Sequence, residues 1–321
     1  MPKVRFFTFL SPEIIPLLTQ YAPPGFEVSV HTSDLPDEEK ISLVQDADFL
    51  ILFPGQISER VLRSAPRLKL IQLVAAGYDS MDVSLCRELG IPVANNGGAN
   101  SIDVAEHAIG LILGFYRRLI ELNRNVRADR WHDIDTGSST YTINGKTVGI
   151  VGLGNIGKRV AHLLCAFGAR LLYYDQYPPV QNVALELGVT RMALEDLLRE
   201  SDIVTIHLPL THETRGIIGK HELSLLKPTA VLVNTCRGPI ADEVALTEVL
   251  SERRILGAAL DVLEQEPPSP DNPILKLDNV LLTPHAAGVT YDTWTRRGEF
   301  VFQNLQRVWE GEAPLAVVRE D

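Results

Sequence analysis

Cysteine is scarce in this chain and does not occur in a metal-binding pattern. The 321 residues include three cysteines, Cys86, Cys165 and Cys236, and no Cys-x-x-Cys pair. An odd and widely spaced set of this kind argues against a disulfide framework and against a zinc site. We therefore expect reduced thiols in a cytoplasmic protein that holds no metal.

Long apolar runs and an excess of positive charge are also missing. No run reaches the roughly 20 apolar residues that a transmembrane helix needs, and the N-terminal stretch lacks the cleavage pattern of a secretory signal. The net charge of -11 and the pI near 5.3 provide no general basic surface for nucleic acid or anionic membrane. We expect neither of these as a partner.

The composition is that of an ordinary globular protein, with 45% hydrophobic and 22% charged residues in a chain long enough for two domains. Short apolar runs alternate with amphipathic segments, which predicts an α/β fold with parallel sheets. Before residue 100 the expected strands are 4–10, 27–31, 49–53, 68–74 and 92–95, and the expected helices are 12–20, 38–45, 58–64 and 81–89.

The most specific pattern lies between Thr147 and Lys158. A buried strand runs into Gly152-x-Gly154-x-x-Gly157 and then into a helix expected at 158–167 and ended by Gly168. The first glycine permits a tight turn, the second lets the backbone approach a pyrophosphate, and the third lets the helix lie close to the strand. The pattern predicts a Rossmann-type dinucleotide site, and its alternative is a glycine-rich turn that binds no ligand.

A second apolar run, 170–174, ends on Asp175, eighteen positions after Gly157. A carboxylate at that place accepts hydrogen bonds from the ribose hydroxyls of NAD and repels the 2′-phosphate of NADP. NAD is therefore the expected cofactor, and Arg191 is a remote basic residue that could offset the repulsion.

Polar residues follow several strands of the chain. Strands are expected at 203–208, 230–235, 258–262 and 280–283, with a helix near 193–199. Open α/β sheets bind ligands at the carboxyl ends of their strands, so these polar residues should share one crevice rim. They are His207-Leu208-Pro209, Cys236-Arg237-Gly238, Asp261 and Pro284-His285. Residues 74–79 leave an earlier strand in the same way, and a simple βα loop is their alternative.

The stretch 96–100 marks a domain boundary. A mostly apolar helix from about 101 to 118 follows it and is expected to be buried between domains or subunits. Residues 121–146 are expected to be irregular, with Trp131 as a packing residue or a dimer contact. The last helix, 291–309, is expected to be interrupted only by Gly298.

Two side chains at strand exits are candidates for chemistry. Arg237, just before a helical segment that starts near Asp242, could hold a carboxylate through two parallel hydrogen bonds, or it could be a surface arginine. His285 could donate or accept a proton, or it could be a structural histidine. Glu266 and Glu264 are both possible partners of His285, and local chemistry does not choose between them.

These segments together resemble the D-isomer-specific 2-hydroxyacid dehydrogenases, which include glyoxylate/hydroxypyruvate reductases and D-lactate and D-3-phosphoglycerate dehydrogenases. The resemblance implies two doubly wound parallel-sheet domains, one flavodoxin-like for substrate and one Rossmann-type for NAD, with the active-site cleft between them. It covers nearly the whole chain and rests on Ala75-Ala-Gly-Tyr-Asp79, Val104-Ala-Glu-His107, the glycine pattern, His207-Leu-Pro-Leu210, Asn234-Thr-Cys-Arg-Gly238, Ala259-Leu-Asp-Val262, Glu266-Pro267 and Pro284-His285.

The resemblance also implies an activity and residue roles. The activity is NAD(H)-dependent interconversion of a small 2-oxoacid and its D-2-hydroxyacid. By match to the family, Arg237 binds the substrate carboxylate and carbonyl, and Glu266, the acid before proline, pairs with His285. Backbone N–H groups of Ala76 and Gly77 hold the substrate carboxylate, with Arg237 and His285 also at the substrate. Asp261 accepts from the nicotinamide carboxamide. The full set of implied cofactor contacts is Gly152, Leu153, Gly154, Asn155, Ile156, Gly157, Asp175, His207, Leu208, Pro209, Thr235, Cys236, Arg237, Asp261 and His285.

The implied substrate domain is 1–99 plus 287–321, and the implied dinucleotide-binding domain is 100–286. The chain would cross the cleft twice, and the two crossings would form a hinge whose closure excludes water. The family is typically dimeric, so we expect a homodimer with the helix at 101–118 and the region of Trp131 at the interface.

Three other functions occur on this fold. Formate dehydrogenases carry glutamine where Glu266 stands, and phosphite dehydrogenases carry a lysine in the loop that corresponds to Val74-Ala-Ala-Gly77. The third function on this fold is that of a transcriptional corepressor, which uses the fold as a binding module that senses NAD(H). Rapid turnover of any 2-oxoacid would exclude this as the main function. Selectivity among 2-oxoacids is expected from first-domain loops such as Phe53-Pro-Gly-Gln56.

Overall fold

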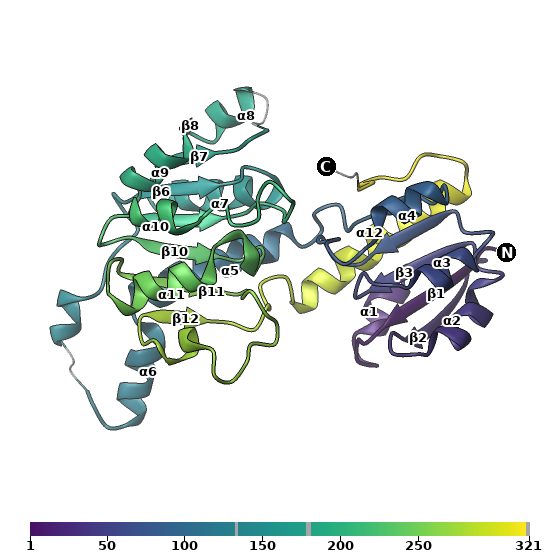
Figure 1. Ribbon diagram of the computed structural model, residues 1–321, viewed down its shortest axis with the longest axis horizontal. Helices are drawn as coiled ribbons and strands as arrows, with labels where there is room; N and C mark the ends of the chain where they lie inside the picture. Colours follow the sequence, from purple (N-terminus) through teal and green to yellow (C-terminus); the bar gives the residue numbers. More distant parts are fainter. Residues whose placement is uncertain (132–133, 178–180, 319–321) are drawn as a thin grey trace. The chain divides into compact units, whose positions relative to one another are not determined.

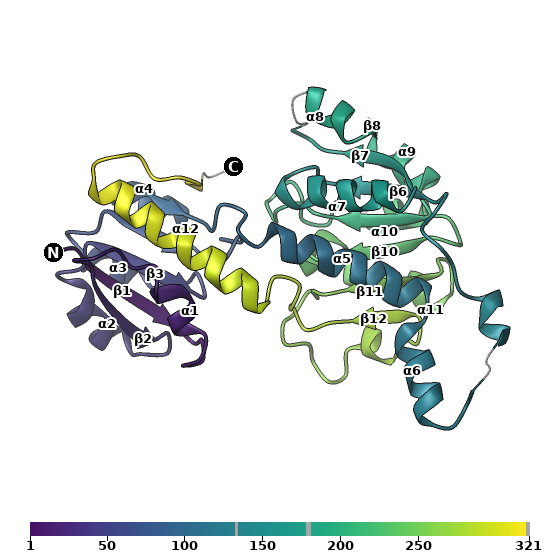
Figure 2. The same cartoon turned by 180° about the vertical axis from the view of Figure 1, so that it is seen from behind.

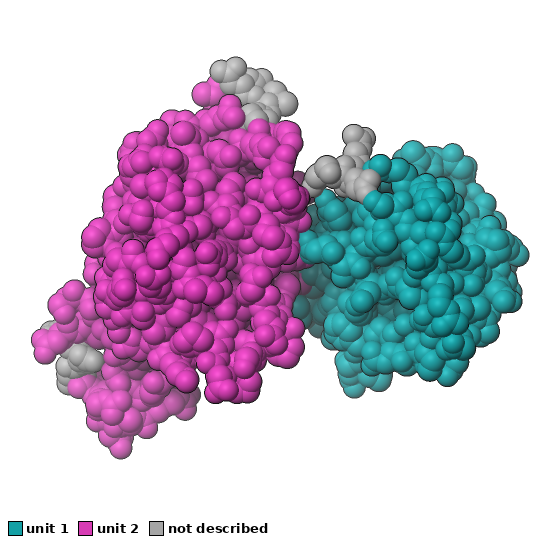
Figure 3. Space-filling view, viewed as in Figure 1, with its two compact units in different colours: residues 1–100, 289–321 teal, residues 101–288 magenta. Residues whose placement is uncertain are grey.

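The structure is a computed structural model that describes residues 1–131, 134–177 and 181–318. The chain divides into two compact units, shown in different colours in Figure 3. Unit 1 consists of Met1–Asn100 and Val289–Asp321, and unit 2 consists of Ser101–Gly288. These limits lie one residue after the expected boundary at 99 and two residues after the one at 286.

Unit 1 contains a five-stranded parallel sheet in the order β2-β1-β3-β4-β5, which is the flavodoxin-like order of a doubly wound sheet. The central strands β3 and β4 are almost entirely buried, because helices cover both faces of the sheet and strands in such sheets are nearly continuous apolar runs. The strands are β1 (Lys3–Thr8), β2 (Glu27–Thr32), β3 (Phe49–Phe53), β4 (Leu70–Leu73) and β5 (Val93–Ala94).

The helices of unit 1 cover its sheet in two layers (Figure 1). Helices α2 (Asp37–Val44), α3 (Glu59–Arg63) and α4 (Val83–Glu88) bury apolar residues on one face, and α1 (Ile15–Thr19) and α12 (Tyr291–Trp309) do so on the other. The predicted interruption of the last helix at Gly298 is wrong, because α12 is continuous. A Cβ on Gly298 would lie 2.6 Å from the backbone oxygen of Leu18, so the glycine instead lets α1 and α12 approach closely.

Unit 2 contains a seven-stranded parallel sheet in the order β12-β11-β10-β9-β6-β7-β8. Counted from β6, this is a Rossmann order, and the direction of winding changes between β6 and β9. Ligands bind outside the carboxyl ends of the strands at such a point. The strands are β6 (Thr147–Val151), β7 (Arg170–Tyr174), β8 (Val189–Arg191), β9 (Ile203–Ile206), β10 (Val231–Asn234), β11 (Gly257–Leu260) and β12 (Val280–Leu282).

Helices lie on both faces of this sheet as well (Figure 2). On one face are α5 (Ser101–Tyr116) and α7 (Asn155–Ala166), and on the other are α9 (Leu194–Glu200), α10 (Lys220–Ser224) and α11 (Glu243–Ser251). Helix α8 (Gln181–Glu186) precedes β8. Short helical turns occur at Ile134–Ser138, Gly238–Ile240 and Pro273–Lys276.

The long apolar helix α5 is buried by its own unit. Ala108, Ile109 and Ile112 pack with α7 and with the sheet of unit 2, so the unit itself supplies the burial that we expected from another domain or subunit. None of the helices that the structure describes has the length and apolar content required to cross a membrane.

The expectation that residues 121–146 are irregular is wrong at its start, because α6 (Leu119–Arg127) is helical. Arg118 has φ 48°, in the left-handed region, and this conformation separates helix α5 from helix α6. The helix buries no side chain, although the spacing of its apolar residues Leu119, Leu122 and Val126 puts them on one face. Its residues are mostly good helix formers, and an ion pair of 2.5 Å between Arg118 and Glu121 supports the first turn.

Candidate active site

In the glycine-rich turn between β6 and α7, one glycine borders open space that a ligand can occupy, and the other two lie against protein backbone. A Cβ on Gly152, which has φ +100°, would lie 2.7 Å from the carbonyl oxygen of His207. A Cβ on Gly157 would lie 2.1 Å from the carbonyl oxygen of Gly152, while one on Gly154 would meet nothing within 4 Å. Helix α7 begins at Asn155, three residues earlier than expected, and no side chain caps it. Its first N–H groups can therefore receive an anionic group such as a pyrophosphate.

Asp175 follows β7 directly and is half-buried. One carboxylate oxygen accepts from the N–H of Leu153 at 2.7 Å, and the other accepts from the N–H of Tyr177 at 2.9 Å. Each oxygen of a carboxylate can accept more than one hydrogen bond, so both keep capacity for ribose hydroxyls. Arg191 lies nearby, with Nη2 3.4 Å from the carbonyl oxygen of Asp175.

Two buried polar atoms at the ends of neighbouring strands lack partners within the described residues. They are Nδ1 of His207, after β9, and Oγ1 of Thr235, after β10. His207 uses its other nitrogen, Nε2, in a 2.9 Å hydrogen bond with Oγ1 of Thr205. Burial lowers the pKa of His207 to about 3, so the ring is neutral at physiological pH. Buried polar atoms normally have a partner, and these two fit the polar groups of a dinucleotide at this edge of the sheet.

The loop that carries Arg237 is held by the side chain of Asn234, the last residue of β10. Asn234 Nδ2 donates to the carbonyl oxygen of Arg237 at 2.9 Å, and Oδ1 accepts from the N–H and from the thiol of Cys236, each at 3.0 Å. Burial raises the pKa of Cys236 to about 11, which keeps the thiol protonated as a donor. Arg237 is half-buried, and its Nη1 donates to the carbonyl oxygen of Cys236 at 2.7 Å.

The Arg237 loop lies directly against the loop that carries Glu266. A Cβ on Gly238 would lie 2.0 Å from the carbonyl carbon of Leu263, so only glycine allows the two backbones to pack at this distance. The N–H of Leu263 in turn donates to Glu266 Oε1 at 3.1 Å. The sequence did not reveal this contact, because the two loops are distant in the chain.

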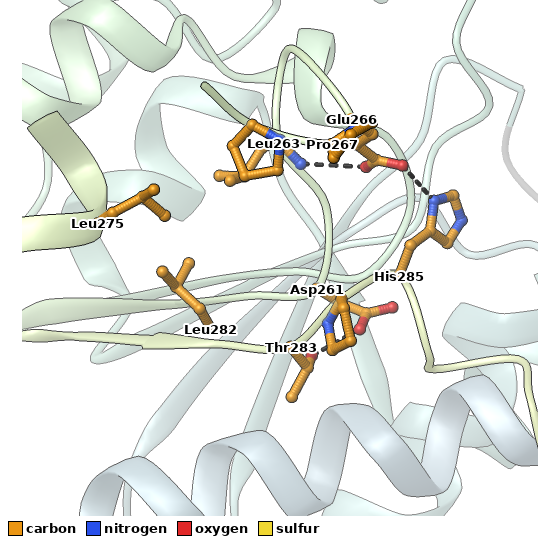
Figure 4. Close-up of a pocket in the computed structure, with 10 residues that line it drawn as sticks. Asp261, Leu263, Glu266, Pro267, Leu275, Leu282, Thr283 and His285 are labelled. Carbon is orange, nitrogen blue, oxygen red and sulfur yellow. Dashed lines mark hydrogen bonds and ion pairs between the residues drawn. The ribbon is translucent and has the colours of Figure 1, made fainter. Parts of the chain in front are cut away.

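His285 and Glu266 form a close pair, with Nδ1 2.6 Å from Oε2 (Figure 4). His285 has φ 52°, a left-handed conformation that is rare for a side chain of this size. Its N–H donates to the carbonyl oxygen of Asp261 at 2.7 Å, which holds the turn. Since Nδ1 faces a carboxylate, Nδ1 carries a proton and Nε2 is the nitrogen left to exchange one.

The competing carboxylate, Glu264, does not reach His285. Its side chain lies 3.5 Å from Arg215, and its N–H donates to Glu243 at 2.7 Å. For Glu266, burial by itself would raise the carboxyl pKa, but the hydrogen bond and charge of His285, the N–H of Leu263 and the charge of Arg237 outweigh it and hold the pKa below its usual range. Glu266 therefore stays ionised at neutral pH.

Asp261, after β11, holds the turn that follows His285. Its side chain is fully buried and accepts from the N–H groups of Ala286 and Ala287, each at 2.9 Å, and from Oγ1 of Thr283 at 2.5 Å. His107 Nε2 lies 3.1 Å from the same hydroxyl. Because the single hydroxyl proton of Thr283 goes to Asp261, His107 must donate from Nε2. Neither Thr283 nor His107 was predicted from the sequence to have a role at the site.

A pocket of about 420 Å³ lies beside the His285–Glu266 pair (Figure 4). Apolar side chains form one part of its lining, and the carboxylates of Asp261 and Glu266 and the ring of His285 belong to the rest. The apolar lining residues are Leu263, Pro267, Pro268, Leu275, Leu282 and Pro284.

Two expected site residues, Ala76 and Gly77, belong to unit 1, and the others belong to unit 2. Ala76 and Gly77 are half-buried in the loop after β4, and their N–H groups have no acceptor within the described parts of the chain. Within unit 2 the structure brings Arg237, Glu266 and His285 onto adjoining loops at the carboxyl ends of β10, β11 and β12.

Comparison with known proteins adds independent information. The family model described as the NAD binding domain of D-isomer specific 2-hydroxyacid dehydrogenases matches residues 109–287. Glyoxylate reductase from Aeropyrum pernix is 40% identical over 326 residues, covering 100% of this chain and 96% of that protein. Glyoxylate reductase from Korarchaeum cryptofilum is 41% identical over 303 residues, covering 92% of this chain and 90% of that protein. A solved structure of D-lactate dehydrogenase from Aquifex aeolicus, complexed with NAD and lactic acid, has a TM-score of 0.81 and 29% identity, covering 96% of each chain.

Proposed function

The chain belongs to the D-isomer-specific 2-hydroxyacid dehydrogenases, NAD-dependent enzymes that interconvert 2-oxoacids and D-2-hydroxyacids, and from this premise we propose how its residues perform the reaction. The observation that carries the proposal is the 2.6 Å contact between Nδ1 of His285 and Glu266. It leaves Nε2 as the nitrogen that exchanges a proton with substrate.

Reducing a ketone requires a proton for the oxygen that becomes an alkoxide. Protonated His285 donates that proton from Nε2 in reduction, and neutral His285 accepts it in oxidation. Glu266 orients the ring and, because it is ionised, favours the imidazolium form over the neutral one. The left-handed turn held by Asp261 keeps the ring in place through the backbone.

Recognition of the 2-oxoacid is divided between an arginine and two backbone groups. Arg237 binds the carboxylate and the carbonyl oxygen, since a planar guanidinium can donate two parallel hydrogen bonds. The N–H groups of Ala76 and Gly77 bind the carboxylate, and their lack of acceptors within the described residues supports this role. Both sets of donors favour an anionic substrate over a neutral ketone.

NAD, when bound, supplies or accepts the hydride. The start of α7 and Gly154 would hold the pyrophosphate, and Asp175 would hold the adenosine ribose. His207 Nδ1 and Thr235 Oγ1 offer polar contacts beside the nicotinamide end, next to Leu208 and Pro209. Asp175 repels a 2′-phosphate, so NADH should be used in preference to NADPH, although Arg191 lies near enough to weaken the preference.

Glyoxylate and hydroxypyruvate are the first substrates to try, because relatives of this chain include glyoxylate reductases. The direct experiment measures absorbance of NADH and of NADPH with a panel of glyoxylate, hydroxypyruvate, pyruvate and phenylpyruvate. We expect turnover of at least one of them with NADH. A purified, folded and NAD-binding protein that reduces none of the panel would refute the proposal. Formate and phosphite oxidation and a corepressor-type module are not favoured, since the matched family acts on 2-hydroxyacids.

A homodimer in the cytoplasm is the further part of the proposal. Helix α6 and the segment after it expose large apolar side chains, with Leu119 51%, Ile120 57%, Val126 48% and Trp131 70% exposed. A second copy of this chain would bury them. Sedimentation should give a dimer that Ile120→Glu weakens, and a monomer at micromolar concentration would exclude it. The exposed free thiol of Cys165 suits a reducing compartment.

A further inference from the structure

The directions of the N–H groups of Ala76 and Gly77 depend on the carbonyl groups of Ala75 and Ala76, which lie in the same two peptide planes. The carbonyl oxygen of Ala75 accepts from the backbone N–H of Asn96 at 3.1 Å. The carbonyl oxygen of Ala76 accepts from the side-chain Nδ2 of Asn95 at 2.9 Å. Neither peptide bond is cis, and in a trans peptide group the C=O and N–H point in opposite directions. Fixing the two carbonyl groups therefore fixes the directions of the two N–H groups that follow them.

The geometry identifies which end of the Asn95 amide is the donor. Oδ1 accepts from the N–H of Gly97 at 3.0 Å, while Nδ2 faces the carbonyl oxygen of Ala76. An amide placed the other way round would set oxygen against oxygen and N–H against N–H, so the assignment is chemically determined.

The backbone of Asn95 is itself held in unit 1. Its N–H donates to the carbonyl oxygen of Ala316 at 3.1 Å, and its carbonyl oxygen accepts from Nε2 of Gln72 at 2.7 Å. Gln72 is completely buried, and its Oε1 accepts from Nδ2 of Asn304 at 2.7 Å. Asn95 thus links a buried amide network to a loop that carries unpaired donors. A fully satisfied network of this kind is rigid.

We propose that Asn95 is a positioning residue that sets the direction of the Gly77 N–H toward the substrate carboxylate. The inference rests on the proposed function, in which the loop after β4 binds that carboxylate. Without the side-chain amide of Asn95, no hydrogen bond holds the carbonyl group of Ala76. The Ala76–Gly77 peptide plane can then rotate, and the N–H of Gly77 no longer points in one direction. The loss should appear in the affinity for the 2-oxoacid, because Asn95 touches no group that transfers the proton and none proposed to hold NAD.

The experiment compares steady-state constants of the full chain and of Asn95→Ala, using the best 2-oxoacid of the panel and NADH. We expect KM for the 2-oxoacid to rise about 10- to 30-fold, on the order expected for one misdirected charge-assisted hydrogen bond. The KM for NADH and kcat should change by less than about threefold. Oxamate, a carboxylate inhibitor, should lose affinity by the same factor as the 2-oxoacid.

Two further variants keep the result interpretable. Asn95→Asp preserves the shape and the acceptor for Gly97 but removes the donor, so its KM should also rise. Asn96→Ala is the matched control: it removes side-chain bonds to Gly98 at 3.0 Å and to Asn100 at 3.2 Å but keeps the backbone N–H on Ala75. It should lower the thermal midpoint and leave KM within about twofold of the wild-type value.

The outcomes separate the inference from its premise. A wild-type protein without turnover of any 2-oxoacid would overturn the proposed function, and the inference would fall with it. An active wild-type protein whose Asn95→Ala and Asn95→Asp variants keep a normal KM would overturn the inference alone. An equal rise of KM in the Asn96→Ala control would also overturn it, since the effect would then not depend on the Asn95 amide.

Discussion

Unit 1 and unit 2 contribute different kinds of group to the proposed reaction. Unit 1 offers two backbone N–H groups, on Ala76 and Gly77, whose directions depend on hydrogen bonds to the carbonyl groups behind them. Unit 2 offers ionisable side chains, Arg237, Glu266 and His285, on loops held by buried polar residues at the strand ends. The backbone donors carry no charge, whereas the side chains of unit 2 hold a positive charge, hold a negative charge or exchange a proton. In the proposed mechanism, unit 2 therefore carries the proton transfer and its pH dependence, and the N–H groups of unit 1 add to the carboxylate binding that Arg237 of unit 2 also provides.

The largest effect that the comparison predicts belongs to His285. His285→Ala removes the group proposed to exchange the proton, so kcat should fall by roughly two to four orders of magnitude. Affinity for NADH, measured by fluorescence titration, should stay close to the wild-type value. If kcat fell by less than tenfold, the rate would not depend on unit 2 in the way described.

A smaller effect on the same unit is expected from Arg237. Arg237→Lys keeps the charge but loses the planar pair of donors, and it should cost on the order of 2–4 kcal/mol in kcat/KM for the 2-oxoacid. NADH affinity serves again as the control. Near-native efficiency of the lysine variant would mean that a point charge is enough, and the bidentate role would have to be abandoned.

The features that the sequence could predict are those that depend on neighbouring residues in the chain. The glycine pattern was recognisable because Gly152 and Gly157 each lie where a Cβ would collide with backbone, and only one residue type satisfies that. Arg237 and His285 were recognisable because polar residues directly follow buried strands, and parallel strands bring their carboxyl ends to one edge. Both signals are local in sequence.

The contacts that the sequence did not reveal are non-local. Glu264 and Glu266 lie two residues apart, and the path of the loop, not their chemistry, brings Glu266 Oε2 to His285. Asn95 lies just before a turn, where an asparagine is ordinary, and its partner Ala76 lies 19 residues away in the chain. Helix α6 is a different case, because the i, i+3, i+7 spacing of Leu119, Leu122 and Val126 is a local signal of an amphipathic helix that the prediction missed.

The smallest predicted effect concerns stability. The pKa of His207 is about 3 in the folded chain, against 6.5 for an ordinary histidine. The unfolded chain therefore binds a proton below pH 6.5 that the folded chain does not, and the free energy of unfolding decreases as pH falls through that value. Between pH 7.5 and 5.5 this group should account for about 1.4 kcal/mol.

Urea unfolding of the wild-type chain and of His207→Gln at the two pH values checks this number. The stability lost on acidification should be about 1.4 kcal/mol smaller in the variant, because glutamine does not titrate in this range. Equal losses in both chains would show that the buried histidine does not contribute.

The most direct test of the central claim, that unit 2 carries the proton relay, is the pH profile of Glu266→Gln measured beside that of Glu264→Gln. The pKa of Glu266 is held below its usual range, so the carboxylate is ionised across the neutral region and favours the imidazolium of His285. Removing that charge should move the basic limb of the reduction profile and the acidic limb of the oxidation profile to lower pH, each limb reporting an apparent value for the coupled pair. Glu264→Gln should leave both limbs in place, because Glu264 pairs with Arg215. Limbs that move with Glu264→Gln and not with Glu266→Gln would contradict the assignment of the carboxylate, and limbs that move with neither would contradict the relay.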